Sequence, residues 1–268
     1  MAQIASLIWD AMGWCPMHAA PRDLPPAPEG SGLKTRKTGD SGPVARRSAR
    51  FMRLAWGVVI VAWILAFLAL PHLPEVIPIH WGLHGEPDGF ADSLTGTLGL
   101  PFLTTFFMIL LLVIPRFDSV QISLAPFRDS YALMILATVS MLFCIEVMTL
   151  AIALGIPLPV VTIVPMLVGV LFVIIGSMLP HIDRNTTIGI RLPWTLASEN
   201  VWKKTHEYGG RIFVIAGVIT VLGSLVAGVW AVALMLAVIL GTTLYIGIWS
   251  YRLAKTITDT GEVPCSLN

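Results

Sequence analysis

Six apolar stretches, each long enough to cross a bilayer as a helix, constrain the fold of this chain more than any other feature. About 20 helical residues cover the roughly 30 Å hydrocarbon core of a membrane. Charged residues make up only 12% of the chain, against about 25% in soluble domains, so a water-soluble fold is excluded. The sequence therefore predicts an all-α integral membrane protein, multi-pass in the cell membrane, with spans at Phe51–Leu70, Leu98–Ile114, Tyr131–Leu154, Val160–Leu179, Ile212–Gly228 and Val229–Tyr251.

Composition shifts divide the chain into four parts. Residues 1–50 are expected to form a cytoplasmic, largely disordered tail with a possible surface helix at its start, because Pro, Gly, Ser and basic residues dominate most of it. Residues 51–154 hold the first three spans and an outer His/acidic loop at 71–97. Residues 155–252 hold the last three spans and an inner loop at 180–210, and residues 253–268 form a cytoplasmic tail.

Short breaks separate the later spans. Pro157 and Pro159 divide one long apolar block into a hairpin, since proline disfavours helix at its own position and at the preceding one. In the last two spans, small residues four apart, Gly223 with Ala227 and Ala237 with Gly241, predict close contact between the two helices.

The lysines and arginines set the expected orientation. If the N-terminus is inside, all 17 basic residues fall in the tails, the inner loops or the adjoining helix ends. Cytoplasmic segments of membrane proteins carry this excess, so the sequence predicts an N-in, C-in topology. The net charge of +1 gives no reason to expect a nucleic-acid partner.

The outer stretch from Pro71 to Ser93 concentrates histidines and acids. His80 and His84 lie four apart, as two zinc ligands on a helix would, but Gly82, Gly85 and Pro87 interrupt the helical register. A hydrogen-bonded outer loop is the favoured reading, and a metal site or a pH-sensing role stays open. The candidate ligand or toxin contacts are His80, Trp81, His84, Gly85, Glu86 and Asp88.

The inner stretch, NTTIGIRLPWTLASENVWKKTH, lies between two apolar blocks, and a short helix is expected from about Leu196 to Tyr208. One interpretation is an interfacial helix with tryptophans at headgroup level and Lys203 and Lys204 on anionic lipid, each worth about 1 kcal/mol. The other is a docking surface for a cytoplasmic protein. The candidate partner-binding residues are Asn185, Gly189, Arg191, Pro193, Trp194, Thr195, Trp202 and His206.

One acid, Glu146, lies deep in an apolar span. A carboxyl group inside a membrane is costly and by default suggests a proton or cation site, as in a coupled transporter, although a hydrogen-bonded structural carboxyl fits equally well. No GxSxG or HExxH motif is present. We therefore expect no enzymatic activity and no cofactor.

Both polar stretches resemble a known family. The segment NTTIGIRLPWTLASENVWKKTHEYGG resembles the signature loop of the SdpI family, bacterial multi-span membrane proteins that include immunity proteins. The segment IPIHWGLHGEPDGF is similar to a domain of unknown function found at the front of such proteins. The resemblance implies resistance to a secreted peptide toxin outside, and signal transduction by sequestering a cytoplasmic repressor inside. The tail of about 50 residues departs from the family pattern.

Overall fold

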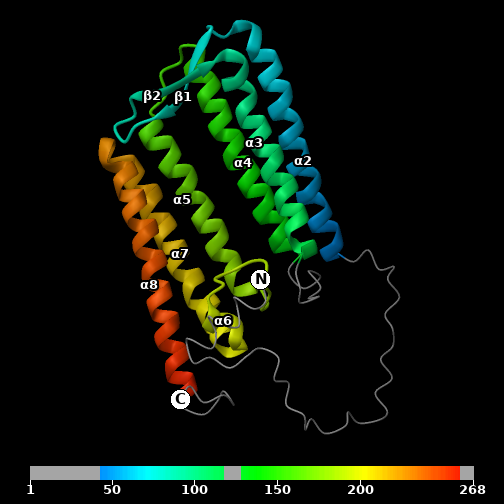
Figure 1. The fold of residues 1–268 in the computed structure, drawn as a ribbon, viewed down its shortest axis with the longest axis vertical. Coiled ribbons are helices and arrows are strands. Elements are labelled where there is room, and N and C mark those ends of the chain that lie inside the picture. Colours follow the sequence, from blue (N-terminus) through cyan, green and yellow to red (C-terminus); the bar gives the residue numbers. More distant parts are fainter. Residues whose placement is uncertain (1–42, 118–127, 260–268) are drawn as a thin grey trace, which may run out of the picture.

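The computed structural model describes residues 43–117 and 128–259, and this part of the chain contains six helices long and apolar enough to cross a membrane. The predicted fold class is confirmed. The helix predicted near the N-terminus and most of both tails lie outside the described residues. The six helices run up and down the long axis of Figure 1: α2 (Pro43–Ala69), α3 (Ser93–Val113), α4 (Arg128–Ala153), α5 (Val160–Met178), α7 (Glu199–Val226) and α8 (Ala231–Asp259).

Several helices extend beyond the predicted spans at the basic end of the molecule. The first helix begins at Pro43, inside the predicted tail, and the last continues to Asp259. The helix predicted from about Leu196 to Tyr208 is wrong as a separate element, because α7 runs without a break from Glu199 into the fifth span. Water satisfies the polar groups of a helix outside the bilayer, so a helix can be longer than its apolar stretch.

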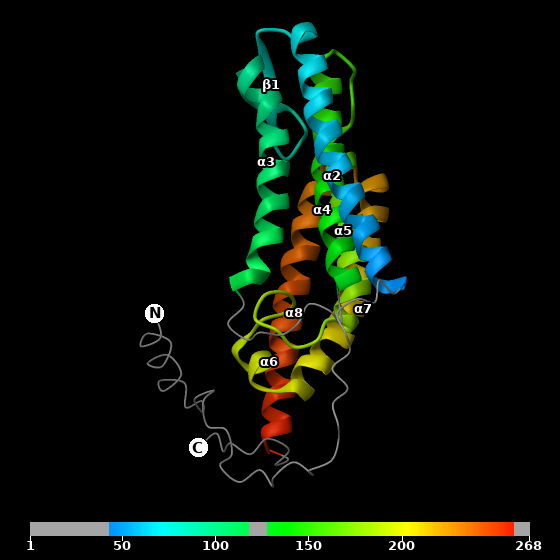
Figure 2. The same ribbon diagram turned by 90° about the vertical axis from the view of Figure 1, so that its right-hand side faces the viewer.

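The helices form two groups of three. Helices α2, α3 and α4 pack together, α5 packs against α7 and α7 against α8, and the groups meet where α4 contacts α5. Figure 1 shows the first group in blue to green and the second in light green to red, and Figure 2 gives the perpendicular view. The α4–α5 connection contains the expected prolines. The short 3-10 turn η5 (Gly228–Trp230) separates α7 from α8 near residue 228, as predicted.

Small residues on α2 allow α4 to approach closely. Ala55, Val59, Ala62 and Ala66 recur at intervals of four and three, and all four are buried. Ala55 and Val59 belong to one core cluster with Met108 of α3 and with Tyr131, Ile135 and Val139 of α4. Inside a lipid bilayer, close packing of this kind is a main source of helix association.

Two pairs of glycines bring α5 and α7 into backbone contact. A Cβ on Gly217 would lie 2.5 Å from the carbonyl oxygen of Gly169, and a Cβ on Gly210 would lie 2.6 Å from that of Gly176. The predicted contact between α7 and α8 holds at Gly223, which faces Leu234. It is wrong for Ala237 and Gly241, which are exposed. The backbone contact between α5 and α7 was not predicted from the sequence.

The outer loop folds as a β-hairpin across the end of the bundle. Strands β1 (Val76–Trp81) and β2 (Pro87–Asp92) pair antiparallel with an irregular register around His80. This adds a small sheet to the all-α expectation. Ile77 is fully buried, and a Cβ on Gly96 of α3 would lie 2.8 Å from its side chain. A Cβ on Gly85 in the turn would lie 2.9 Å from Val161 of α5, so the hairpin reaches both helix groups.

The two ends of the bundle differ in charge. Within the described part of the chain every lysine and arginine lies at the end opposite the hairpin, at the ends of α2, α4, α7 and α8 or in the adjoining segments. The hairpin carries His80, His84, Glu86, Asp88 and Asp92. This separation is what the N-in, C-in topology requires, while the orientation itself stays a prediction.

Candidate functional site

We define the inner loop as residues 182–198, which connect the 3-10 turn η4 (Leu179–His181) to α7 and include the short helix α6 (Pro193–Ala197). Asn185 organises its first half. The buried Asn185 side chain accepts the amides of Thr187 and Ile188 at 2.8 and 2.6 Å, and it donates to the carbonyl of Asp183 at 2.8 Å. Asparagine replaces backbone partners in such turns, so one side chain fixes the path of the loop.

A stacked pair on α7 supports the loop from beneath. The rings of Trp202 and His206 lie 4.0 Å apart at 20°, and both side chains are buried. The Trp202 indole donates to the carbonyl of Ile182 at 2.8 Å. Nε2 of His206 accepts the amide of Ile190 at 3.0 Å, and Nδ1 lies 2.9 Å from the carbonyl of Trp202. Because an amide donates and a carbonyl accepts, His206 is a neutral imidazole protonated on Nδ1.

Gly189 fits between the loop and this pair. Its φ is +114°, a backbone conformation that residues other than glycine rarely adopt. A Cβ at this position would overlap Nε2 of His206 and would lie 3.1 Å from the Trp202 ring. Glycine is therefore needed here both for its backbone angle and for its lack of a side chain.

The second half of the loop is tied to α8. Thr195 is fully buried, and its hydroxyl lies 2.7 Å from the carbonyl of Ile190 and accepts the amide of Leu192 at 2.9 Å. The Trp194 indole donates to the hydroxyl of Ser250 at 2.9 Å, and its ring packs edge-on against Tyr251. These bonds join the loop to the last helix, 56 residues later in the sequence.

The eight candidate residues of the inner stretch thus differ in exposure. Asn185, Thr195, Trp202 and His206 are all buried and hold the loop together. The Trp202 ring does not face lipid headgroups, because it is buried under the loop, while its depth in the membrane stays a prediction. Arg191 is exposed and donates to the carbonyl of Thr186. Any surface that contacts a partner must therefore centre on Arg191 and on the partly exposed Pro193 and Trp194.

The hairpin places its polar candidates on the surface. Nδ1 of His80 lies 2.5 Å from Oδ1 of Asp88, and both side chains are more than half exposed. His84 and Glu86 are exposed in the turn, whereas Trp81 and Gly85 are partly buried. His80 and His84 do not share a helical face, since His80 is in a strand. No group of three or more His, Cys, Asp or Glu side chains that could hold a metal occurs in residues 43–117 and 128–259.

Large apolar side chains are also exposed on the hairpin, a feature that the sequence reading missed. Val76, Ile79, Leu83 and Phe90 expose between 46% and 60% of their surface. Burial does not alternate along β1, whose register is irregular around His80, so a period of two could not have indicated these side chains. The hairpin therefore offers both apolar and polar groups to a ligand.

Asp92 caps α3 and gives a test of the hairpin junction. Its carboxylate accepts the Thr95 amide at 2.9 Å, and this hydrogen bond holds the pKa of Asp92 below its usual 3.8. A lowered pKa stabilises the fold above pH 3.8 and ceases to do so as the pH falls through the folded-state pKa. We expect Asp92→Ala to lower the Tm at pH 7 by a small amount, and this difference to shrink near pH 3. Asp92→Asn, which keeps a hydrogen-bond acceptor, should lower the Tm by less. If Asp92→Ala lowered the Tm equally at pH 7 and near pH 3, the capping role of the carboxylate would be contradicted.

Glu146 is buried in α4, and neither of its carboxyl oxygens has a hydrogen-bond partner in the described residues. It follows Val139 and Leu142 on the buried stripe of α4 that continues from the core shared with α2. The hydrogen-bonded structural reading therefore has no partner group in this part of the chain. An unpaired buried charge costs on the order of several kcal/mol. Glu146 therefore remains a candidate proton or cation site.

Comparisons with known proteins agree with the two stretches singled out. Residues 181–249 match the SdpI/YfhL protein family, and residues 57–105 match a domain of unknown function (DUF1648). Over 206 residues the chain is 25% identical to the immunity protein SdpI of Bacillus subtilis (strain 168). The aligned region covers 76% of this chain and 95% of that protein. It is 40% identical over 55 residues to the uncharacterized membrane protein YbgB of the same organism, 20% of this chain and 60% of that protein. No solved structure matches the chain.

Proposed function

We propose that this protein is a membrane immunity protein that protects its cell from a secreted peptide toxin. The observation that carries the proposal is the similarity to the immunity protein SdpI, which extends over nearly the whole of that relative. The hairpin is the expected toxin contact, because apolar side chains such as Leu83 and Phe90 lie beside the exposed polar groups His84 and Glu86. A peptide that inserts into membranes offers apolar and polar groups in the same way.

A survival experiment tests this proposal. A sensitive bacterium expressing the protein is challenged with peptides secreted by the source organism and its neighbours, beside a strain that expresses an unrelated six-span protein. Protection by this protein alone supports immunity. Equal killing of both strains by every peptide would contradict it.

We further propose that the inner loop binds a cytoplasmic regulator and retains it at the membrane. The supporting geometry is a continuous path through α5. The hairpin turn contacts α5 beside Val161, and the opposite end of α5 leads through η4 into the inner loop. A toxin that shifts the hairpin would thereby act on the helix that carries the loop.

Replacing Arg191 and Trp194 tests the regulator surface. We expect Arg191→Ala/Trp194→Ala to reduce recruitment of a cytoplasmic protein to membranes at least tenfold, because the pair removes an exposed charge and a partly exposed indole that also ties the loop to α8. Lys203→Ala/Lys204→Ala is the control, since both lysines are exposed on α7. The measurement is recovery of cytoplasmic proteins with the purified, cross-linked membrane protein during toxin challenge. Unchanged recruitment by the Arg191/Trp194 variant, with membrane insertion intact, would refute the surface.

A proton- or cation-coupled transporter is the second candidate, and one observation favours it. Glu146 lies inside the bundle with no hydrogen-bond partner in the described part of the chain. Glu146→Gln keeps the shape of the side chain and removes the ionisable group. Loss of toxin protection together with loss of proton uptake into proteoliposomes in this variant would favour transport, and unchanged uptake would remove the candidate.

A further inference from the structure

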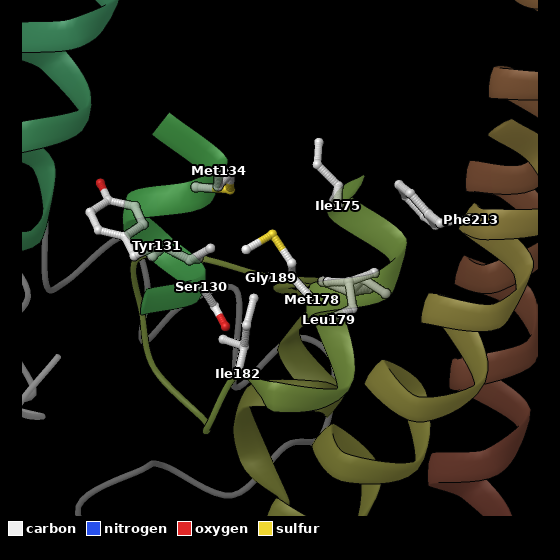
Figure 3. A pocket seen from close by; sticks show the side chains of 11 residues that line it. Ser130, Tyr131, Met134, Ile175, Met178, Leu179, Ile182, Gly189 and Phe213 are labelled. Carbon is white, nitrogen blue, oxygen red and sulfur yellow. The ribbon is translucent and has the colours of Figure 1, made fainter. Parts of the chain in front are cut away.

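Two neighbouring cavities open at the basic end of the bundle, where α4 meets α5. The first has a volume of about 190 Å³ and is lined almost entirely by apolar side chains, including Tyr131 and Met134 of α4, Ile175 of α5 and Phe213 of α7. Figure 3 shows Met134, Ile175 and Phe213 around the space beside Gly189 of the inner loop. A cavity with such an apolar lining suits an aliphatic chain.

The second cavity, of about 440 Å³, is charged. Arg47 and Arg50 of α2, Asp129 of α4 and His181 of η4 line it. Ser130 and Met178 line both cavities, so these two residues alone are common to the apolar and the charged space. Methionine has a flexible side chain, so Met178 presents little barrier between them.

Within the described residues, the two arginines and one oxygen of the aspartate have no partner. Neither Arg47 nor Arg50 forms an ion pair with an acid in residues 43–117 and 128–259. Oδ1 of Asp129 is buried and accepts no hydrogen bond in the same part of the chain. The two arginines and the aspartate together carry a net charge of +1. The cavity therefore offers a cationic pair and one hydrogen-bond acceptor.

We propose that the two cavities together bind one phosphatidylglycerol molecule. Its phosphate pairs with Arg47 and Arg50, a glycerol hydroxyl donates to Asp129, and an acyl chain passes Met178 into the apolar cavity. The single negative charge of this headgroup balances the net charge of +1, which zwitterionic phosphatidylethanolamine does not. A soluble phosphate ester would leave the apolar cavity empty. The site is independent of the proposed immunity.

This lipid also contacts the inner loop. Ile188, Gly189 and Ile190 of the inner loop also line the apolar cavity, and the amide of Ile190 is the donor to His206. An acyl chain there fills space next to the segment that the Trp202 and His206 pair supports. Lipid binding is therefore expected to stabilise the loop as well as the α4–α5 contact.

Native mass spectrometry of the full chain, purified in mild detergent, tests the site. The protein is offered equal amounts of phosphatidylglycerol, phosphatidylethanolamine and phosphatidylcholine. We expect one retained phosphatidylglycerol per chain, and about tenfold less retention by Arg47→Gln/Arg50→Gln. Arg252→Gln/Lys255→Gln is the matched control, because it removes two charges from the same end of the bundle on α8, away from the cavities. This control should retain the lipid like the unmodified protein.

A second variant tests the apolar cavity without changing charge. Ile175→Trp fills that cavity and should lower retention by a similar factor, with the protein still monodisperse. Soluble glycerol 1-phosphate should not displace the lipid. Equal retention of the three lipids, full retention by Arg47→Gln/Arg50→Gln, or displacement by glycerol 1-phosphate would each overturn the proposal.

Discussion

Gly217→Leu is expected to separate α5 from α7 and to abolish the stable fold. The new Cβ would lie 2.5 Å from the Gly169 carbonyl oxygen, a backbone atom that no change of rotamer can move. Overpacking usually costs about 1–3 kcal/mol, and overlap with backbone places this variant at or above the upper value. The measurement is the Tm of the purified protein in detergent, together with its elution on size exclusion.

Gly241→Leu is the matched control for this change. Gly241 lies on the exposed side of α8 with nothing within 4 Å of its Cβ position. The control should keep the Tm within a few degrees and should elute as the unmodified protein does. If Gly217→Leu and Gly241→Leu behaved alike, the close approach of α5 and α7 would be wrong.

Gly189→Ala is expected to unfold the inner loop while leaving the six helices in place. The backbone angle of +114° alone costs a side chain about 1–3 kcal/mol. The added methyl group also overlaps Nε2 of His206, so the hydrogen bond from the Ile190 amide is lost. The measurement is limited trypsin digestion, in which cleavage after Arg184 and Arg191 should become at least tenfold faster.

A glycine in the α4–α5 connection, outside the inner loop, is the control for backbone strain elsewhere in the chain. Gly155 also has a positive φ, +90°, but nothing lies within 4 Å of its Cβ position. Gly155→Ala therefore carries backbone strain without overlap, and cleavage within the inner loop should stay slow. Equal protection of the loop in Gly189→Ala and in the unmodified protein would show that His206 does not hold it.

The spans were predictable because a membrane-crossing helix requires a long apolar stretch, and the length of each stretch can be read from the sequence. The continuity of α7 from Glu199 into the fifth span was not, since Lys203, Lys204 and Glu207 interrupt the apolar pattern although the helix continues through them. The hairpin was expected as a structured loop, but not as strands, because its irregular register around His80 weakens the alternation that indicates a strand.

The interior of the inner loop could not be predicted, because its contacts are distant in the sequence. Ile190 and His206 are 16 residues apart, and Trp194 and Ser250 are 56 residues apart. The sequence pattern made Trp202 and His206 candidates for binding a partner, whereas both are buried as structural support. The glycines of α5 and α7 recur at intervals of seven residues. This spacing is visible in the sequence, but it does not indicate which two helices are in contact.

Both proposed contacts depend on the hairpin facing outward and the inner loop facing the cytoplasm, and labelling of single cysteines measures this most directly. Cys15, Cys144 and Cys265 are first replaced by serine, and His84→Cys or Arg191→Cys is then introduced. Intact cells are treated with a membrane-impermeant maleimide. The account predicts labelling at position 84 in intact cells, and at position 191 only after permeabilisation. Labelling at position 191 in intact cells, with position 84 protected, would contradict it.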